Sequence, residues 1–91
     1  MSTEFIVVRT CSADAYDAVP QRLMRIEISE ALPALSRAGY RVLADAGRMC
    51  VLEKDGLEIT LYSSGRVLVR IESAEAAEEA AKALYEALGV A

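Results

Sequence analysis

The stretch Leu57–Tyr62 reads LEITLY, and it is followed by the turn SSG at 63–65 and by the run RVLVRI at Arg66–Ile71. Both runs alternate apolar and polar residues and are rich in β-branched side chains, a pattern typical of half-buried strands. The glycine-containing turn between them predicts a β-hairpin. Ser73 then precedes an alanine-rich segment that ends at Gly89, which indicates a capped helix. The sequence therefore predicts a sheet hairpin that leads directly into a helix.

Three further apolar runs of the same kind precede this hairpin. They predict strands at Glu4–Thr10, Tyr40–Ala44 and Arg48–Lys54. Between the last of these and Leu57, the pair Asp55-Gly56 favours a two-residue turn in which both central residues have positive φ.

A helix is predicted between Pro20 and Gly39, after a short polar loop at Cys11–Asp17. Proline suits the first turn of a helix, because its missing N–H would have no intrahelical partner there. Apolar residues recur at helical spacing through this region, although Pro33 should kink or divide the helix. The alternative is that Leu23–Ile28 is extended, since its apolar residues also alternate.

The resulting order is β-α-β-β-β-β-α in a single domain that spans residues 1–91. Four consecutive strands favour an antiparallel meander. We expect a two-layer α+β fold, with an antiparallel sheet of about five strands and the helices on one face.

Composition points to a second apolar surface beyond the core. Apolar residues make up 54% of the chain, above the usual ~45–50%, and a dimer or partner interface would account for the excess. The formal charge of −4 disfavours binding to nucleic acid or to an anionic membrane. No apolar run is long enough to span a bilayer, and no signal peptide is recognisable, so we expect a cytoplasmic protein.

The inventory of reactive side chains is small. The chain has no histidine and two cysteines, Cys11 and Cys50. No metal site or cofactor is predicted, because a cysteine-only zinc site needs more thiols than two. The cysteines are expected to be reduced in the cytoplasm, although a disulfide is an alternative. A thiol-dependent enzyme or a ligand carrier is one functional alternative, and it would require a thiol whose pKa is lowered.

Strand alternation places an unusual set of side chains on the face of the sheet away from the helices. Leu57, Ile59 and Leu61 of the hairpin should face the helices, together with Val67 and Val69. In the first strand both faces are apolar, and either Met49/Val51 or Cys50/Leu52 adds a further apolar pair. The binding candidates predicted for the open face are Phe5, Val7, Thr60, Tyr62, Arg66, Leu68 and Arg70.

The run from Ile59 to Arg70, followed by Ser73 and a helix, resembles one repeat of the TATA-box-binding protein family. The resemblance implies a half-saddle domain whose open, concave sheet face binds the DNA minor groove. By position, Tyr62, Leu68 and Arg70 would face the nucleic acid, with Thr60 beside them. This chain departs from the family pattern in having one repeat and a negative net charge. Two carboxylates, Glu58 and Glu72, also fall on the face that would meet phosphates.

From these patterns we expect a small non-catalytic interaction domain. Its open sheet face would be buried in a homodimer or against another protein. The alternative is nucleic-acid binding through the same face of a dimeric saddle, in which Tyr62 would stack on a base and Arg66 and Arg70 would contact phosphates.

Overall fold

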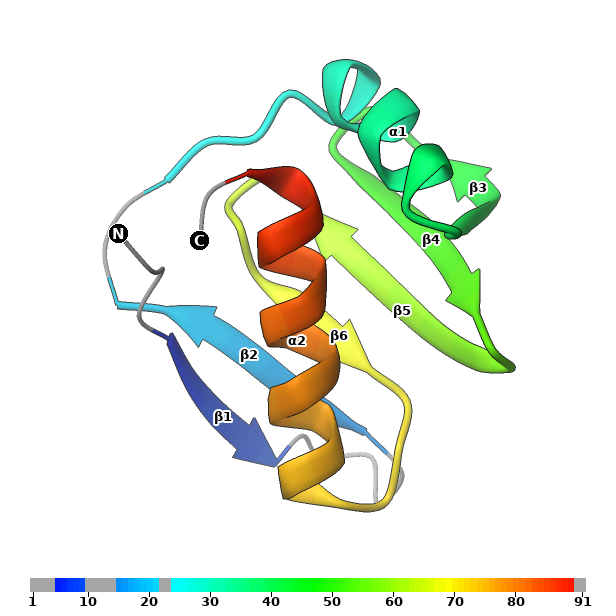
Figure 1. Cartoon of the computed structure of the whole chain (residues 1–91). Helices are drawn as coiled ribbons and strands as arrows, with labels where there is room; N and C mark the ends of the chain where they lie inside the picture. The colour runs from blue at the N-terminus through cyan, green and yellow to red at the C-terminus, as the bar shows by residue number, and fades with distance from the viewer. Residues whose placement is uncertain (1–4, 10–14, 22–23, 90–91) are drawn as a thin grey trace.

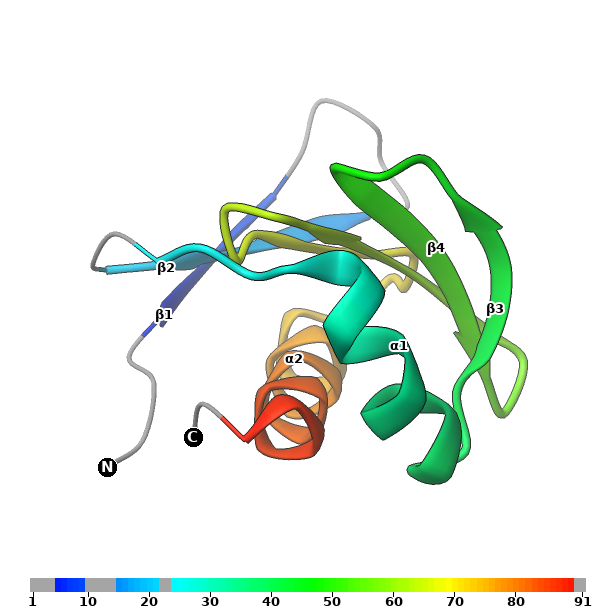
Figure 2. The same ribbon diagram turned by 90° about the horizontal axis from the view of Figure 1, so that it is seen from above.

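The structure is a computed structural model that describes residues 5–9, 15–21 and 24–89. Its elements in chain order are β1 (Phe5–Arg9), β2 (Tyr16–Pro20), α1 (Ile28–Arg37), β3 (Arg41–Asp45), β4 (Met49–Lys54), β5 (Leu57–Tyr62), β6 (Val67–Val69) and α2 (Ala74–Leu88). The strands form one six-stranded antiparallel sheet in the order β1-β2-β6-β5-β4-β3 (Figure 1). Both helices lie on the same face of this sheet (Figure 2). The predicted α+β class is confirmed, with six strands in place of about five.

The additional strand is β2, and here the sequence-based prediction is wrong. Tyr16–Pro20 pairs along its whole length with β1, where a loop and the first turn of a helix were expected. Ala18 is buried in the core at 2% exposure. Pro20 is tolerated because β6 pairs only with the first three residues of β2, so the missing N–H of Pro20 removes no bond to β6.

The first helix is shorter than predicted. It begins at Ile28, and Glu27 before it is extended, with φ −80° and ψ 104°. Residues 24–27 are neither helix nor strand, and the N–H of Ile26 donates a 2.7 Å hydrogen bond to the carbonyl of Ser63. The extended alternative thus fits this segment better, while Leu23 lies outside the described residues. Pro33 stands inside α1 without dividing it.

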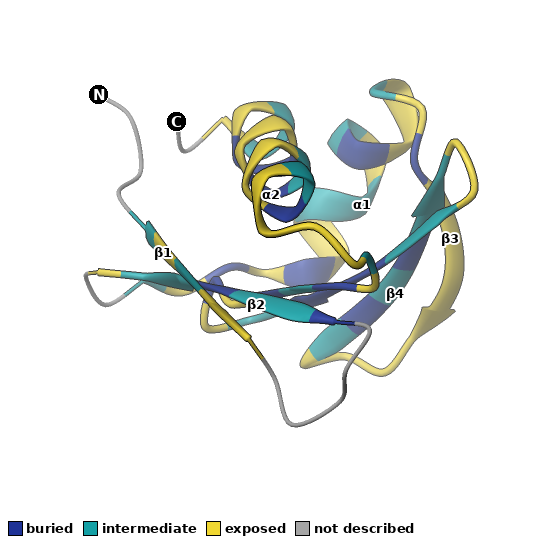
Figure 3. Cartoon of the chain, turned by 90° about the horizontal axis from the view of Figure 1, so that it is seen from below, coloured by how far each residue is buried: buried dark blue, intermediate teal, exposed yellow. Residues whose placement is uncertain are grey.

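The core lies between the helices and the inner face of the sheet (Figure 3), to which β5 and β6 contribute Ile59, Leu61, Val67 and Val69. The residues of α2 that are buried against it are Ala77, Ala81, Leu84 and Tyr85. Two alanines on this side bring the helix close to the sheet, as their small side chains allow. Ser73 caps α2 by accepting a 3.3 Å hydrogen bond from Ala76, and Gly89 ends the helix with φ 80°. Both predicted helix ends are therefore confirmed.

Two turns of the sheet depend on positive φ angles. Asp55 and Gly56 have φ 53° and 80°, which confirms the predicted primed turn between β4 and β5. Gly65, between β5 and β6, has φ 92°. The carbonyl of Gly65 accepts a buried 2.6 Å hydrogen bond from the hydroxyl of Tyr85, so this turn is fixed to α2.

We predict that Gly65→Ala destabilises the protein more than Gly47→Ala. Both positions have positive φ, with 92° at Gly65 and 84° at Gly47, so each alanine adds backbone strain of about 1–2 kcal/mol. A Cβ at Gly65 would also overlap the Sδ of Met24, whereas a Cβ at Gly47 meets nothing within 4 Å. Displacing Met24 should cost roughly a further 1 kcal/mol.

Urea unfolding of the two variants and the wild type measures this difference. Gly47→Ala serves as the matched control, because it carries the strain without the overlap. Equal losses in the two variants would contradict the idea that the turn is packed tightly against Met24.

Candidate functional site

The register of the strands defines which side chains share the face that no helix covers, here called the open face. One row of opposed residues crosses all six strands in the order Val8, Asp17, Leu68, Thr60, Val51 and Ala44. A neighbouring row contains the cross-strand pairs Ile6 with Val19 and Tyr62 with Met49. Most of these side chains are apolar, so the open face differs from an ordinary solvated sheet face.

Among the large apolar side chains of this face, the most exposed lie at its β1 edge. Ile6 is 49% exposed and Val8 is 45% exposed, and both are aliphatic. The half-buried apolar residues that continue the surface are Val19, Met49, Val51, Tyr62 and Leu68. Of the two alternatives in β4, the pair Met49 and Val51 therefore lies on the open face, while Cys50 and Leu52 are buried in the core.

Phe5 and Val7 were predicted on the open face, and this placement is wrong. Val7 lies opposite the core residue Ala18, so it points toward the helices. The ring of Phe5 packs against Tyr85 of α2, with 5.2 Å between the ring centroids. Since both faces of β1 are apolar, alternation alone could not decide between them. The pair that reaches the open face is Ile6 and Val8.

Three predicted candidates of the hairpin do lie on the open face. Tyr62 and Leu68 are half-buried there. Thr60 shares their face but is only 8% exposed, because Leu68 and Val51 stand directly on either side of it in the neighbouring strands. Tyr62 and Leu68 can thus contact a partner, whereas Thr60 is mostly covered by its own neighbours.

Arg66 is bound within the chain rather than free on the surface. Its Nη2 lies 2.7 Å from Oδ2 of Asp17, and its guanidinium carbon lies 5.3 Å from the centre of the Tyr62 ring. The hydrogen bond to Asp17 raises the pKa of Arg66. Oδ1 of Asp17 is buried without a hydrogen-bond partner in the described part of the chain. The guanidinium therefore joins β2 to the end of β5 across the open face.

Arg70 also has an acidic partner, but a weaker one. Its Nη1 lies 3.3 Å from Oε2 of Glu58, and the side chains are 59% and 41% exposed. A pair so well solvated contributes roughly 0–1 kcal/mol. Each of the two predicted phosphate contacts, Arg66 and Arg70, therefore has a carboxylate beside it that offsets its positive charge.

On the described strands and the residues next to β6, three cations of the open face each stand beside a carboxylate. The cations are Arg41, Arg66 and Arg70, and the carboxylates are Asp17, Glu53 and Glu58. Each cation stands opposite or in contact with one of the carboxylates. The face therefore presents apolar side chains among paired charges of both signs.

Sequence reasoning missed Asp17 because it placed that residue in a loop. The signal available was the alternation of Tyr16 and Ala18 with Asp17 and Val19, which is too short and too polar to indicate a strand by itself. Ile6 and Val8 were not among the predicted binding candidates, because Phe5 and Val7 on the other side of β1 are equally apolar. The ion pair between Asp17 and Arg66 joins residues 49 apart in sequence, and no local pattern predicts such a contact.

Cys50 is the one thiol in the described part of the chain, since Cys11 lies outside it. Cys50 is 1% exposed and belongs to the core. Burial raises its pKa to about 11, and the nearby Asp45 adds to the rise. A thiol that remains protonated is a poor nucleophile, so Cys50 does not have the lowered pKa that thiol chemistry requires.

Comparison with protein-family models, with curated proteins and with solved structures found no match to this chain. Among the described residues, no group of three or more metal-binding side chains stands together. Neither helix in that part of the chain is long and apolar enough to cross a membrane. Function is therefore inferred from the surfaces of the chain itself.

We predict that Cys50 is unreactive in the folded protein. With a pKa of about 11, roughly one thiol in ten thousand is ionised at pH 7. In a Cys11→Ser variant, a disulfide reagent should modify Cys50 about 100-fold or more slowly than in urea. Rapid modification without denaturant would contradict the burial of this thiol.

The same pKa predicts that stability falls with alkaline pH. Unfolding returns the thiol to a pKa near 8.5, so between about pH 9 and pH 11 the unfolded chain loses its proton while the folded chain keeps it. The unfolding free energy at pH 10 should therefore fall by about 1–2 kcal/mol more in the wild type than in Cys50→Ala, relative to pH 7.5. Identical pH profiles of the two proteins in urea unfolding would count against this assignment.

Proposed function

We propose that this chain is a non-catalytic interaction domain whose open face binds a second copy of itself. The observation that supports the proposal is an apolar sheet face whose charges are balanced within the chain. Ile6 and Val8 provide its most exposed apolar groups, and Tyr62 and Leu68 extend it toward the middle of the sheet.

Removal of water from these side chains would supply the attraction. Exposed apolar groups that form a continuous surface are typical of protein interaction sites. Burying the exposed halves of Ile6 and Val8 would contribute about 1 kcal/mol each. The half-buried apolar residues around them would add further apolar contact area to the interface.

The balance of charge favours a second copy as the occupant. In a symmetric dimer the same patch meets itself, so an excess of one sign would repel. The open face avoids this, since Arg66 and Arg70 already have Asp17 and Glu58 as partners. The net charge of −4 is carried mainly elsewhere, including the outer side of α2.

The same pairing weakens the case for nucleic acid. The order β-α-β-β-β-β-α expected for the half-saddle repeat runs here from β2 to α2, which supports the resemblance. Its first strand would then be β2 and not the strand predicted at Glu4–Thr10, which lies outside this order as β1. Affinity for phosphates, however, requires cations that are free to replace counterions. Because Arg66 and Arg70 stand beside carboxylates, we propose that a half-saddle of this kind serves here as a protein-binding surface.

The prediction is that Ile6→Lys weakens self-association while Val42→Lys does not. Ile6 is exposed on the open face, whereas Val42 is 38% exposed opposite the core residue Leu52, and thus belongs to the other face. Lysine at position 6 would bury a charge in the dimer, so its dissociation constant should rise about tenfold or more. Sedimentation equilibrium at increasing concentration measures this constant.

Three outcomes oppose the proposal. The first is a wild-type chain that remains monomeric up to about 1 mM. The second is a dimer that only Val42→Lys disrupts, which would place the interface at the β3 edge. The third is a salt-dependent mobility shift with mixed-sequence DNA or RNA, which would favour the nucleic-acid alternative.

A further inference from the structure

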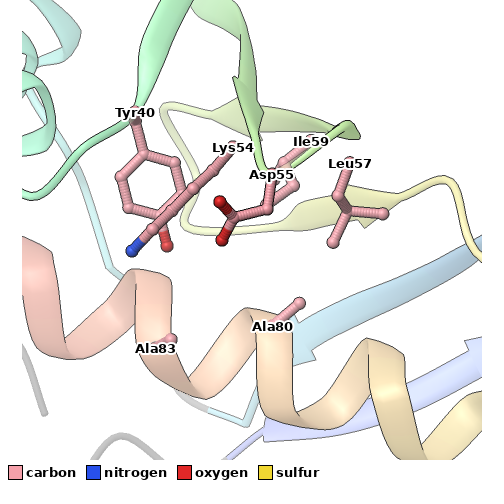
Figure 4. Close-up of a pocket in the computed structure, with 7 residues that line it drawn as sticks. All are labelled: Tyr40, Lys54, Asp55, Leu57, Ile59, Ala80 and Ala83. Carbon is pink, nitrogen blue, oxygen red and sulfur yellow. The ribbon is translucent and has the colours of Figure 1, made fainter.

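A pocket of about 210 Å³ lies on the helix-covered side of the sheet, between α2 and the β4–β5 hairpin (Figure 4). Its floor is apolar, and the residues that form it are Leu57 and Ile59 of β5 and Ala80 and Ala83 of α2. Alanine leaves this space open, since no side chain beyond Cβ extends from the helix toward the strands. The pocket is separate from the open face, which lies on the opposite side of the sheet.

Three polar groups converge at the mouth of this pocket. Figure 4 shows the hydroxyl of Tyr40, the ammonium of Lys54 and the carboxylate of Asp55 directed toward the same space. Lys54 Nζ lies 4.9 Å from the centre of the Tyr40 ring. Within the described chain, none of these three polar groups makes a hydrogen bond or ion pair. They are therefore available to a ligand.

The backbone holds these groups in place. The backbone of Asp55 belongs to the primed turn, where its φ is 53°, and this turn places the carboxylate at the mouth of the pocket. Tyr40 is 5% exposed, and burial raises the pKa of its hydroxyl, which consequently remains a hydrogen-bond donor at neutral pH. An apolar cavity with a few fixed polar groups at its mouth is the usual form of a small-molecule site.

We propose that this pocket binds a free α-amino acid with an apolar side chain. The carboxylate of the ligand would accept hydrogen bonds from Lys54 and Tyr40, and its ammonium would donate to Asp55. Its side chain would lie on the floor formed by β5 and α2. Opposite charges on two adjacent residues match a molecule that carries an ammonium and a carboxylate group on the same carbon atom.

Charge and size both narrow the choice of ligand. A simple carboxylic acid would meet repulsion from Asp55, and a simple amine would meet repulsion from Lys54. The pocket volume of about 210 Å³ is smaller than the roughly 300–1,000 Å³ of cavities that hold drug-sized ligands. An amino acid of the size of leucine fits this description.

The first test compares three probes of one carbon skeleton by calorimetry and by amide chemical shifts. L-leucine carries both charges, 4-methylpentanoate lacks the ammonium, and 3-methylbutylamine lacks the carboxylate. We expect leucine to bind and to shift the amides of Ala80 and Ala83, with each analogue weaker by about tenfold or more. No leucine binding at about 10 mM would overturn the proposal, as would equal binding of either analogue.

The second test uses single-residue variants. Lys54→Met keeps the apolar stem over Tyr40 and removes the charge. Asp55→Asn removes the other charge, and asparagine tolerates the positive φ of the turn. Each should weaken leucine binding about tenfold or more, while Lys82→Met, an exposed control on α2 outside the pocket, should not change it.

Unchanged affinity in both pocket variants would place the binding elsewhere and overturn the proposal. Amide spectra of each variant without ligand establish that it is folded, and the two variants act independently, so one suffices if the other unfolds. Because the pocket and the open face are on opposite sides of the sheet, leucine binding can be measured in Ile6→Lys as well. Loss of self-association and loss of leucine binding are thereby distinguishable.

Discussion

Tyr85 donates a buried 2.6 Å hydrogen bond to the carbonyl of Gly65, and its ring packs against Phe5. One side chain of α2 thus holds the turn between β5 and β6 and the edge strand β1 together. Burial raises the pKa of this hydroxyl to about 12, so it stays a donor under all ordinary conditions. The two layers depend on this contact, because it fixes α2 at both the centre and the β1 edge of the sheet. The open face includes Ile6 and Val8 only while β1 remains paired with β2 and packed against α2 in this way.

Local patterns were sufficient for every element except β2 and the beginning of α1. The β5–β6 hairpin, the Asp55-Gly56 turn and the caps of α2 each follow from neighbouring residues, so the sequence predicted them correctly. β2 was missed because Tyr16–Pro20 becomes a strand through pairing with β1 and β6, not through its own propensity. The sequence could not show which side of β1 points toward the helices, since both of its sides are apolar. The contact of Phe5 with Tyr85, which is distant in sequence, places Phe5 on the helix side.

The two sides of the sheet differ in which side chains lack a partner within the chain. On the open face, charges are matched by neighbours of the same chain, and apolar groups are left for a partner. At the pocket near α2, the polar groups of Tyr40, Lys54 and Asp55 have no hydrogen-bond or ion-pair partner within the described chain, and they stand above a small apolar floor. The alternation of the strands therefore separates a surface suited to a protein from a cavity suited to a small zwitterion. The residues of the open face and of the pocket are all present in the sequence, but their grouping follows only from the strand register and from the position of α2.

The ladder between β2 and β6 has a consequence for how the chain reaches this structure. Every other neighbouring pair of strands is consecutive in the chain, whereas Asp17 of β2 and Arg66, the residue before β6, are 49 residues apart. Closing a loop of that length costs about 3 kcal/mol of chain entropy, so β3 to β6 can assemble well before the β1–β2 hairpin docks. Until it does, the edge of β6 is unpaired and open to other chains. The β2–β6 ladder, with the ion pair between Asp17 and Arg66, therefore both completes the sheet and covers an edge that could otherwise pair with other chains.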